Sequence, residues 1–279
     1  MNVAVIITAF NRKKKTIDCL ERLFRIPGNG VDITVYLTDD SSSDGTSDEV
    51  KKLFPQVLIS TGDGSLFWGG GMNLSWKRAV ADGGFDGYLW LNDDTVLEDN
   101  VWSEITEADK FCRDKYGKGG IYIGPTLSMD RKSMTYGGSV TTSRWRSRYR
   151  MLEPDGTFRN CEIANGNVTF ISDDVVRKIG CFYPGYIHGA DYDYTYWAFR
   201  EGFPLLLLRD YTGLCDNDHK SHRENLLKRS LRERIRYLYA PNGMQLSTAL
   251  LFQKRFYPWH VPLTFISYWT KALCPWLIK

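Results

Sequence analysis

The first 125 residues alternate short apolar runs with amphipathic stretches, and this alternation is the feature that most constrains the fold. The runs at residues 3–8, 32–38 and 88–91 have the length and the Val, Ile and Leu content of buried strands. The stretch at residues 13–25, between the first two runs, has the apolar spacing of a helix. Strands that alternate with helices at this pitch predict an α/β fold, with a mainly parallel central sheet flanked by helices.

The rest of the chain divides into two parts. Residues 126–220 combine short β-like pieces with two helical stretches that each end at a Gly. Residues 221–279 are basic, aromatic and helical in pattern. We therefore predict one α/β domain over residues 1–220, with halves at 1–125 and 126–220, followed by a helical C-terminal region at 221–279.

The composition is that of a folded globular protein, because 43% of the 279 residues are hydrophobic and can form a sizeable core. The six cysteines form no CxxC pair, so we expect reduced thiols and neither a disulfide framework nor a zinc site. The first ten residues carry no basic leader, and we expect a strand there rather than a signal peptide. These observations predict a cytoplasmic location.

Polar side chains follow three of the predicted strands at the point where each strand ends. They are residues 8–12, residues 39–40, and Asn92, Asp93 and Asp94. The carboxyl ends of parallel strands meet at one edge of a sheet, where open α/β sheets bind ligands. Carboxylates gathered there stay ionised when a divalent cation binds among them together with phosphate oxygens. A metal that holds a diphosphate explains the acidic run; capping of a turn by Asp93 and Asp94 explains it as well.

Four motifs, in their order and spacing, resemble those of the inverting family 2 glycosyltransferases of GT-A fold. The motifs are VIITAFNR at 5–12, TDDSSSDGT at 38–46, GGGMN at 69–73 and NDDT at 92–95. With the segment around Asp191, the resemblance covers roughly residues 3–220. It implies a GT-A fold with a nucleotide-sugar-binding half and an acceptor half. It also implies a role in bacterial surface-polysaccharide assembly.

The resemblance implies a nucleotide pocket at the ends of the first two strands. It assigns Asp40 to the base of the nucleotide. The other residues assigned to this pocket are Thr8, Ala9 and Arg12. Gly70 and Gly71 would let the backbone approach the nucleotide, since Gly has no Cβ, and Asn73 would bond near the sugar. A plain turn before a helix expected over 72–82 explains the glycines equally well.

The NDDT motif stands where the family has its DxD motif. Asn92 and Asp94 take the outer positions, and the resemblance makes Asp94 the ligand of Mg²⁺ or Mn²⁺ and places Asp93 close to the ribose. Asn92 replaces the commoner Asp, which lowers the negative charge and argues against direct metal ligation by that residue. Relatives often complete the metal shell with a His beyond a late strand, here His219. A solvated loop residue is the alternative for His219.

The segment GYIHGADYDYTYWAFREGF at 185–203 resembles the family's acceptor-side stretch, in which an Asp opens a helix that a Gly closes. Counting back from Gly202 assigns the general base to Asp191. Ala190 stands where the family usually has a second acid. General-base catalysis contributes about 10²–10⁴-fold in rate. The structural alternative for Asp191 is a helix N-cap, worth ~1 kcal/mol.

Three further residues are assigned to the acceptor side. Gly166 matches a small-residue position that faces the acceptor in relatives. His188, three residues before Asp191, is expected to touch the acceptor or a phosphate, unless it is only a loop residue. Trp68 is expected to stack on a sugar ring, with core packing as the alternative.

These features predict an inverting glycosyltransferase that moves a sugar from a UDP- or dTDP-sugar to a saccharide or polyprenyl-diphosphate-linked acceptor. Two other classes stay open. A sugar nucleotidyltransferase shares the sheet and the metal chemistry, but its Gly-rich loop after the first strand is replaced by TAFNRKKK. A non-catalytic nucleotide-sugar-binding protein would keep Asp40 and Asp94 and would not need Asp191.

The C-terminal region is strongly basic. Residues 220–279 carry eleven Lys or Arg and two Glu, so the rest of a chain whose net charge is +3 has a net charge of −6. We expect a basic helix over 222–239 and a second helix that ends near Phe252. Pro258 and Pro262 interrupt the apolar runs before the roughly 20 residues that a membrane span needs.

The basic and aromatic pattern predicts peripheral binding to the inner face of the cell membrane, where anionic lipid attracts Lys and Arg. A solvated helical face or an oligomer contact is the alternative. No nucleic-acid-binding motif is present, so we expect no nucleic-acid partner.

Overall fold

The computed structural model describes residues 1–145, 147–217 and 222–277. It divides the chain into two compact units, here called the sheet unit and the helical unit. The sheet unit consists of Met1–Val140 and Arg150–Asn217. The helical unit consists of Thr141–Tyr149 and Asp218–Lys279. The helical unit therefore includes a short segment from the middle of the chain.

The sheet unit is built on an eight-stranded sheet with the order β11-β14-β6-β13-β4-β1-β2-β3. Its strands are β1 (Asn2–Ala9), β2 (Asp32–Asp39), β3 (Leu58–Thr61), β4 (Gly87–Leu91), β6 (Ile121–Ile123), β11 (Arg159–Asn160), β13 (Val168–Ser172) and β14 (Leu205–Leu207). The half formed by β3, β2, β1 and β4 is parallel throughout. Strand β13 is antiparallel to both of its neighbours, and β11 to β14, while β14 and β6 are parallel. The predicted α/β class is confirmed, with a sheet that is mixed in its second half.

Two smaller sheets contain the remaining strands. One has the order β5-β15-β7-β8 and the other β10-β9-β12. Their strands are β5 (Val96–Leu97), β7 (Thr126–Leu127), β8 (Met134–Tyr136), β9 (Gly138–Ser143), β10 (Arg148–Met151), β12 (Ile163–Ala164) and β15 (Gly213–Leu214). The predicted short β-like pieces after residue 125 are therefore strands of these sheets.

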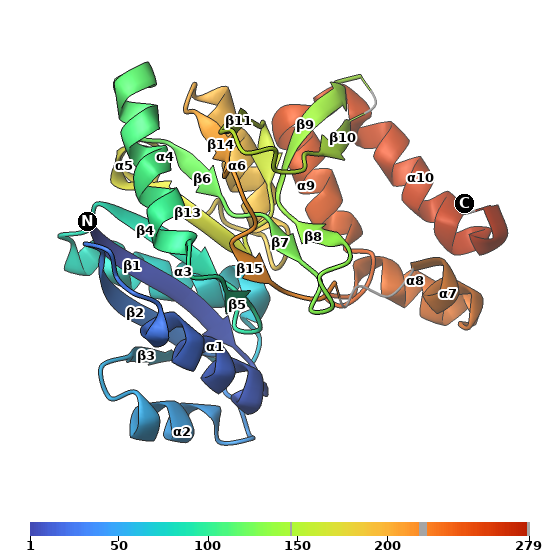
Figure 1. Cartoon of the computed structure of the whole chain (residues 1–279). Helices are drawn as coiled ribbons and strands as arrows, with labels where there is room; N and C mark the ends of the chain where they lie inside the picture. Colours follow the sequence, from blue (N-terminus) through green and yellow to red (C-terminus); the bar gives the residue numbers. More distant parts are fainter. Residues whose placement is uncertain (146, 218–221, 278–279) are drawn as a thin grey trace. The chain divides into compact units, whose positions relative to one another are not determined.

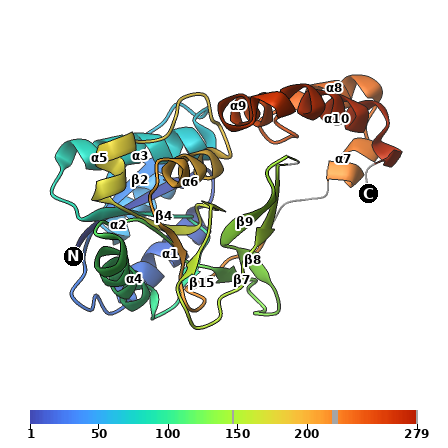
Figure 2. The same cartoon turned by 90° about the horizontal axis from the view of Figure 1, so that it is seen from above.

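Helices cover both faces of the large sheet. On one face lie α1 (Lys13–Arg25) and α4 (Val101–Tyr116), and on the other lie α3 (Phe67–Asp82), α5 (Asp173–Ile179) and α6 (Ala190–Arg200), as Figures 1 and 2 show. Helix α2 (Thr46–Leu53) adds Val50 to the core on the α1 side. The sheet is thus buried on both faces, which explains why its strands are continuous apolar runs rather than alternating ones.

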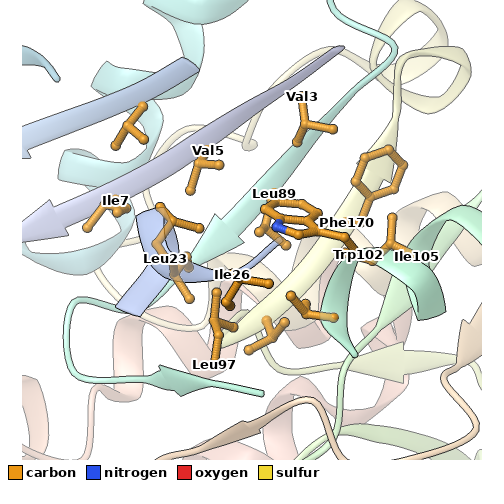
Figure 3. Packing of buried hydrophobic residues seen from close by; sticks show 14 of the residues in the cluster. Val3, Val5, Ile7, Leu23, Ile26, Leu89, Leu97, Trp102, Ile105 and Phe170 are labelled. Carbon is orange, nitrogen blue, oxygen red and sulfur yellow. The ribbon is translucent and has the colours of Figure 1, made fainter. Parts of the chain in front are cut away.

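The core on the α1 and α4 side takes every second residue of the central strands. Val3, Val5 and Ile7 of β1 point to this side and are fully buried. They pack with Leu23 of α1 and Trp102 of α4 in the cluster that Figure 3 shows. This period of two is the geometry of a strand, whose successive side chains point to opposite faces.

The opposite face of the sheet carries an aromatic cluster. The Trp76 ring of α3 lies 5.1 Å from the Trp90 ring of β4 and 5.0 Å from the Tyr194 ring of α6. Phe182 completes the group, 4.8 Å from Trp90. These edge-on and tilted contacts fix α3 and α6 side by side on the sheet, since each aromatic pair adds about 0.5–1.5 kcal/mol beyond area burial. The first turns of α3 and α6 contain Trp68 and Asp191, two of the predicted site residues.

The helical unit contains α7 (His222–Leu227), α8 (Leu231–Tyr239), α9 (Leu246–Phe256) and α10 (Val261–Leu273). The prediction of one helix over 222–239 is wrong. The helix is interrupted between Leu227 and Leu231. The side chains of Ser230 and Glu233 form a capping box there, which starts α8. The second helix of this region ends at Phe256 rather than near Phe252.

A small core joins these helices. Its buried members are Leu226, Tyr237, Leu238, Met244 and Ala272. Two 3₁₀ turns, η1 (Pro258–His260) and η2 (Pro275–Leu277), flank α10. Within the described residues no helix is long and apolar enough to cross a membrane.

Candidate active site

The loops that follow β1 and β2 are joined by hydrogen bonds. The Asn11 backbone N–H donates to Ser42 Oγ at 2.8 Å, and Asn11 Oδ1 accepts from the Ser43 backbone N–H at 2.8 Å. Asp44 accepts from the backbone N–H of Lys13 at 2.9 Å. The parallel register sets Ala9 opposite Asp39, so the two strands end at the same level. The two predicted polar clusters, residues 8–12 and 39–40, therefore lie together at one edge of the sheet.

Asp40 is buried and organises the loop before α3. Its carboxylate accepts from the backbone N–H groups of Gly64, Leu66 and Phe67 at 2.8, 2.9 and 3.1 Å. These three bonds leave about one of the roughly four lone-pair sites of a carboxylate. The contact of Asp40 with a nucleotide base stays a prediction. What the structure shows is an anchor for the chain at Leu66 and Phe67.

The glycine run lies inside a helix, so the expected helix start at residue 72 is wrong. Helix α3 begins at Phe67, and the run occupies its first turn. A Cβ on Gly71 would lie 2.0 Å from Oγ1 of Thr8, and a Cβ on Gly69 would lie 2.5 Å from the carbonyl oxygen of Tyr186. Both glycines are therefore required for close packing of α3. A Cβ on Gly70 would meet only the Leu66 side chain, at 3.1 Å.

Phe67 has a left-handed backbone conformation, with φ of +52°. Such a conformation is an outlier for a bulky residue and is found mainly where the surrounding structure imposes it. Here the hydrogen bond from its N–H to Asp40 imposes it. Asn11 and Ser41, in the loops after β1 and β2, also have positive φ, 51° and 59°. Three of the seven described non-Gly residues with positive φ therefore lie at the edge where the polar clusters meet.

Two cations at the start of α1 form ion pairs with the NDDT motif at residues 92–95, here called the acidic motif. Nη1 of Arg12 lies 3.1 Å from Asp93 Oδ1 and 2.8 Å from Asp94 Oδ2, and Lys15 Nζ lies 3.5 Å from Asp94. Asp93 is buried, and Thr16 donates to its second oxygen at 3.3 Å. Burial raises the pKa of Asp93 to about 6, although Arg12 acts in the opposite direction. Asp94 is more accessible, with 13% of its side chain exposed.

The donor atoms around Asp94 fit a metal ion that binds together with a diphosphate. Both carboxylates have protein partners, but Asp94 is the more exposed of the two and its cations Arg12 and Lys15 are themselves exposed, so Asp94 is the carboxylate that a metal ion could reach. Among the residues that the structure describes, no group of three or more His, Cys, Asp or Glu could hold a metal. Mg²⁺ commonly takes one or two carboxylates and completes its shell with phosphate oxygens and water. His219, the second predicted ligand, lies outside the described residues.

Trp68 connects the acidic motif to the acceptor-side residues. Its Nε1–H donates to Asn92 Oδ1 at 2.8 Å. Its ring lies against Gly166, where a Cβ would come within 2.8 Å of two ring atoms and 3.1 Å of Asp191 Cβ. Asn92 also donates its backbone N–H to the carbonyl of Asn167 at 3.1 Å. The structure therefore brings Trp68, Asn92, Gly166 and Asp191 together.

Asp191 lies in the first turn of α6 and is partly buried. Its Oδ2 accepts from the backbone N–H of Gly166 at 2.9 Å. Burial raises the pKa of Asp191 to about 6, against the lowering effect of the backbone N–H groups of Tyr192 and Gly166. Asp193, two residues on, is buried and accepts from the Tyr186 hydroxyl at 2.6 Å, as a structural residue would.

Two further predicted residues, His188 and Asn73, lie near this group in the sequence but are held by other neighbours or buried in α3. The His188 ring stacks edge-on against Phe67, with centroids 5.8 Å apart. The Asn73 side-chain oxygen, on α3, is buried and has no hydrogen-bond partner within the described part of the chain. A buried acceptor left unpaired costs about 1–3 kcal/mol. Its expected bond near the sugar stays a prediction.

Lys15, Thr16 and Cys215 contact Asp93 or Asp94 and were not predicted. Lys15 and Thr16 were assigned only to a helix, yet both face the motif with Arg12, as residues three and four apart on a helix do. The thiol of Cys215 lies 3.5 Å from Asp94 Oδ1 and 3.5 Å from Nδ2 of Asn167. The helical spacing was a usable signal for the first two; nothing in the sequence pointed to Cys215.

Comparison with solved structures shows the same fold in several glycosyltransferases. S. aureus TarS 1–349 in complex with UDP-GlcNAc matches with a TM-score of 0.59 and 14% identity, over 98% of this chain and 80% of that one. The same protein in complex with UDP matches with a TM-score of 0.57 and 13% identity, over 91% and 70%. A mannosyltransferase from Pyrobaculum calidifontis, in complex with GDP-Man and Mn²⁺, matches with a TM-score of 0.53 and 14% identity, over 98% and 75%.

The sequence itself identifies the family. No curated protein sequence matches the chain. The model of glycosyl transferase family 2 matches residues 4–178, which is more than half of the chain and includes the loops after β1, β2 and β4. These are the loops that the hydrogen bonds and ion pairs above bring to one edge of the sheet. The chain belongs to glycosyl transferase family 2 and is a glycosyltransferase of GT-A fold.

Proposed function

We propose that this glycosyltransferase transfers a sugar from a nucleotide-diphosphate sugar to an acceptor hydroxyl with inversion, in a single displacement. The observation that supports this most is the segment Leu66–Trp68, which contacts three parts of the chain. It donates backbone N–H groups to Asp40, bonds Asn92 through Trp68, and lies against Gly166 beside Asp191. Inversion requires a base across the sugar from the leaving group, and such an arrangement provides one.

The donor is a UDP- or dTDP-sugar in this proposal. Arg12 and Lys15 carry positive charge at the edge of the sheet where the polar clusters meet, and both pair with Asp94. A diphosphate would offer them stronger acceptors, because charge-assisted bonds to phosphate are short and strong. The bound UDP and UDP-GlcNAc of the TarS structures support a uridine nucleotide, and the bound GDP-Man of the mannosyltransferase shows that the fold also serves guanosine.

Asp191 acts as the general base. The Gly166 N–H and the N-terminal turn of α6 hold its carboxylate in place. Its Oδ1 then accepts the proton of the acceptor hydroxyl as that oxygen attacks the anomeric carbon, and the bond from this carbon to the diphosphate oxygen breaks. A pKa near 6 leaves the base ionised at neutral pH. It is also closer to the pH at which the enzyme works than the pKa of an ordinary Asp, which favours general-base catalysis.

Asp94, with His219 as a second candidate, would hold a Mg²⁺ or Mn²⁺ ion. The ion would neutralise the negative charge that develops on the diphosphate leaving group. The protein's own part is to place Asp94 at the strand end, with Arg12 and Lys15 beside it. Thr8, Ala9, Asp40 and Asp93 would shape the nucleoside side of the pocket, with Gly70, Gly71 and Asn73 near the donor sugar.

The acceptor is a saccharide, free or linked to polyprenyl diphosphate, as in bacterial surface-polysaccharide assembly at the inner face of the cell membrane. Trp68, Gly166 and His188 would lie on its side of the site. An indole ring beside a catalytic carboxylate suits a sugar, because the apolar face of the sugar stacks on it.

The test is a panel of nucleotide sugars with Mg²⁺ or Mn²⁺, measured for nucleotide-diphosphate release with and without saccharide acceptors. Wild type should release the nucleotide diphosphate from one donor, and Asp191→Asn should lose about 10²–10⁴-fold in kcat while still binding the donor. Asp48→Asn is the matched control, since Asp48 also lies in the first turn of a helix, α2. Pyrophosphate release from a sugar phosphate and a nucleoside triphosphate would instead indicate a nucleotidyltransferase. Donor binding without turnover on any acceptor would indicate a binding protein.

A further inference from the structure

The end of the chain has cations and no acidic residue. From Arg234 to Lys279 there are six Lys or Arg and neither Asp nor Glu. The helical unit as a whole, with Arg144, Arg146 and Arg148 of its central segment, carries fourteen Lys or Arg and three acidic residues. Its net charge is therefore +11, and the sheet unit has a net charge of −8. Any partner of the helical unit is expected to be anionic.

Helix α10 has two different faces. Thr264 and Ala272 are buried, and Tyr268 and Trp269 pack with them against the core that joins α10 to the other helices. Figures 1 and 2 show α8, α9 and α10 side by side. One face of α10 is thus used to hold the unit together.

The other face of α10 is apolar and exposed. Leu263, Ile266 and Leu273 are 52%, 60% and 46% exposed. Steps of three and seven residues keep these three positions on one side of α10. Trp259 of η1 and Leu277 of η2, in the turns that flank the helix, are also exposed, and we call the five residues together the apolar stripe (Trp259, Leu263, Ile266, Leu273 and Leu277).

Exposure of the apolar stripe to water is unfavourable in free energy. A run of large apolar side chains on one face, as opposed to single exposed ones, marks an interaction surface. The charged positions near it are basic, among them Lys254, Arg255 and Lys271. Trp259 at one end and Trp276 at the other, 50% and 62% exposed, are of the residue type that concentrates where membrane meets water.

A second copy of the chain would fit this surface less well than a lipid surface would. Pairing two helical units through their stripes would bring two units of net charge +11 together. An anionic bilayer offers both an apolar layer for the stripe and negative head groups for the cations. Helix α10 has 13 residues, a length suited to lying in the interface plane.

We propose that α10 with its two flanking 3₁₀ turns is an amphipathic anchor that lies in the head-group region of an anionic membrane. The apolar stripe points toward the acyl chains, and the cations of the helical unit contact the anionic head groups. This surface is independent of the donor and acceptor sites of the sheet unit, so it stands or fails separately from the proposed reaction.

The test is co-sedimentation of the full chain with two kinds of vesicle. One is phosphatidylcholine alone, and the other is phosphatidylcholine with about one third phosphatidylglycerol. Wild type should sediment with the anionic vesicles, and the bound fraction should fall when salt is raised. Ile266→Glu should lower the vesicle affinity about tenfold or more, since it places a charge in the inserted stripe. Arg232→Glu with Arg236→Glu should lower it further on anionic vesicles only.

Leu53→Glu is the control for the stripe variant, because Leu53 of α2 is also an exposed leucine, 44% exposed. It should bind vesicles as wild type does. Circular dichroism of each variant separates lost binding from lost folding, and Ile266→Ser serves if the Glu variant does not fold. Wild type that stays in the supernatant with both vesicles would overturn the proposal. So would a wild-type dimer that Ile266→Glu converts to a monomer, because the stripe would then be a contact between two copies.

Discussion

The two acidic regions of the sheet unit have opposite surroundings. Asp93 and Asp94, after β4, both pair with Arg12, and Asp94 also pairs with Lys15. Asp191, at the start of α6, has a backbone N–H and the side of an indole ring as its neighbours. Among the described residues, no Lys or Arg forms an ion pair with it. Trp68 joins the two regions, because it bonds Asn92 beside Asp93 and lies against Gly166 beside Asp191.

The difference shows how neighbours decide what a carboxylate can do. A carboxylate paired with cations, such as Asp94, can exchange those partners for a metal ion and phosphate oxygens. A carboxylate that is desolvated and has no cation holds a proton more readily, which is what a general base must do in the transition state. Asp93 lies between the two cases, since it pairs with Arg12 but burial still raises its pKa to about 6. In the proposed reaction, Asp94 therefore belongs to a charge-binding region and Asp191 to a proton-accepting region.

The largest effect that would sharpen this comparison is expected from Asp94→Asn. It removes the accessible carboxylate of the charge-binding region, together with its ion pairs to Arg12 and Lys15, while Arg12 keeps its ion pair with Asp93. We expect kcat/KM to fall about a hundredfold or more, with a higher metal concentration needed for half-maximal rate. Titrating Mg²⁺ and Mn²⁺ against the rate, for the variant and for wild type, measures both quantities.

Asp99→Asn is the control for this variant. Asp99 follows the same segment, but 77% of its side chain is exposed and it pairs with Arg22, away from Arg12 and Lys15. Its substitution should leave the metal response unchanged. An Asp94→Asn enzyme with the wild-type metal response would remove Asp94 from the metal site.

Much of the fold could be predicted from local pattern. The helix at 13–25 and the strands at 3–8 and 32–38 have the apolar periods that the structure confirms, because local spacing and burial agree there. The start of α3 could not be predicted in this way. Its glycines weaken the helical pattern, and the start is fixed by Asp40, which bonds Leu66 and Phe67 across 26 and 27 residues.

The C-terminal helices show two signals that were present in the sequence. Ser230 and Glu233 have the spacing of a capping box, which marks the break that a single helix over 222–239 overlooks. Pro262 was taken to interrupt an apolar run, but it lies in the first turn of α10, where proline is tolerated because its missing N–H would have no partner in the helix.

The sequence predicted which residues come together but not the contacts among them. Convergence of strand ends in a parallel sheet indicated Arg12 and Asp94, and the family resemblance indicated Asp191; their roles stay predictions. The bond from Trp68 to Asn92 joins residues 24 apart, and Cys215 reaches Asp94 across 121 residues. Such contacts depend on how whole elements pack, which local spacing does not encode.

A smaller effect is expected in the stability of Asp191→Asn. Burial raises the pKa of Asp191 from 3.8 to about 6, so the folded state binds its proton more tightly than the unfolded chain. Ionising Asp191 therefore lowers the free energy of unfolding as pH rises from about 4 to about 6. Asparagine does not ionise, and the variant should be more stable than wild type by about 1–3 kcal/mol at pH 8.

Urea unfolding at pH 4 and pH 8 checks this directly, because the gain should disappear at the lower pH. Over the same range kcat/KM of wild type should fall about tenfold per pH unit below pH 6, as the base takes up its proton. The N-cap of α6 is Gly189, so Asp191 is not the predicted N-cap. A variant that is less stable than wild type at pH 8 would mean that the Asp191 carboxylate stabilises the first turn of α6 and is not a desolvated base.

The smallest effect is expected from Trp68→Phe, which tests whether the two regions depend on each other. Phenylalanine removes the N–H that bonds Asn92 and covers less of the surface beside Gly166 and Asp191. The lost hydrogen bond should cost about 1 kcal/mol, or roughly fivefold in kcat/KM. Because Asp191 becomes more hydrated, the acidic limb of the pH profile should move from about 6 toward the ordinary value of 3.8.

The shift of the pH limb is what distinguishes positioning from simple packing. Trp145→Phe is the control, since Trp145 is 71% exposed and lies outside the sheet unit, and it should change neither the rate nor the pH profile. If Trp68→Phe lowers the melting temperature and the rate but leaves the limb near pH 6, then Trp68 supports the fold without setting the environment of Asp191. If the limb moves, the indole that bonds the acidic motif also keeps water from the base, and one side chain maintains the contrast between the two regions.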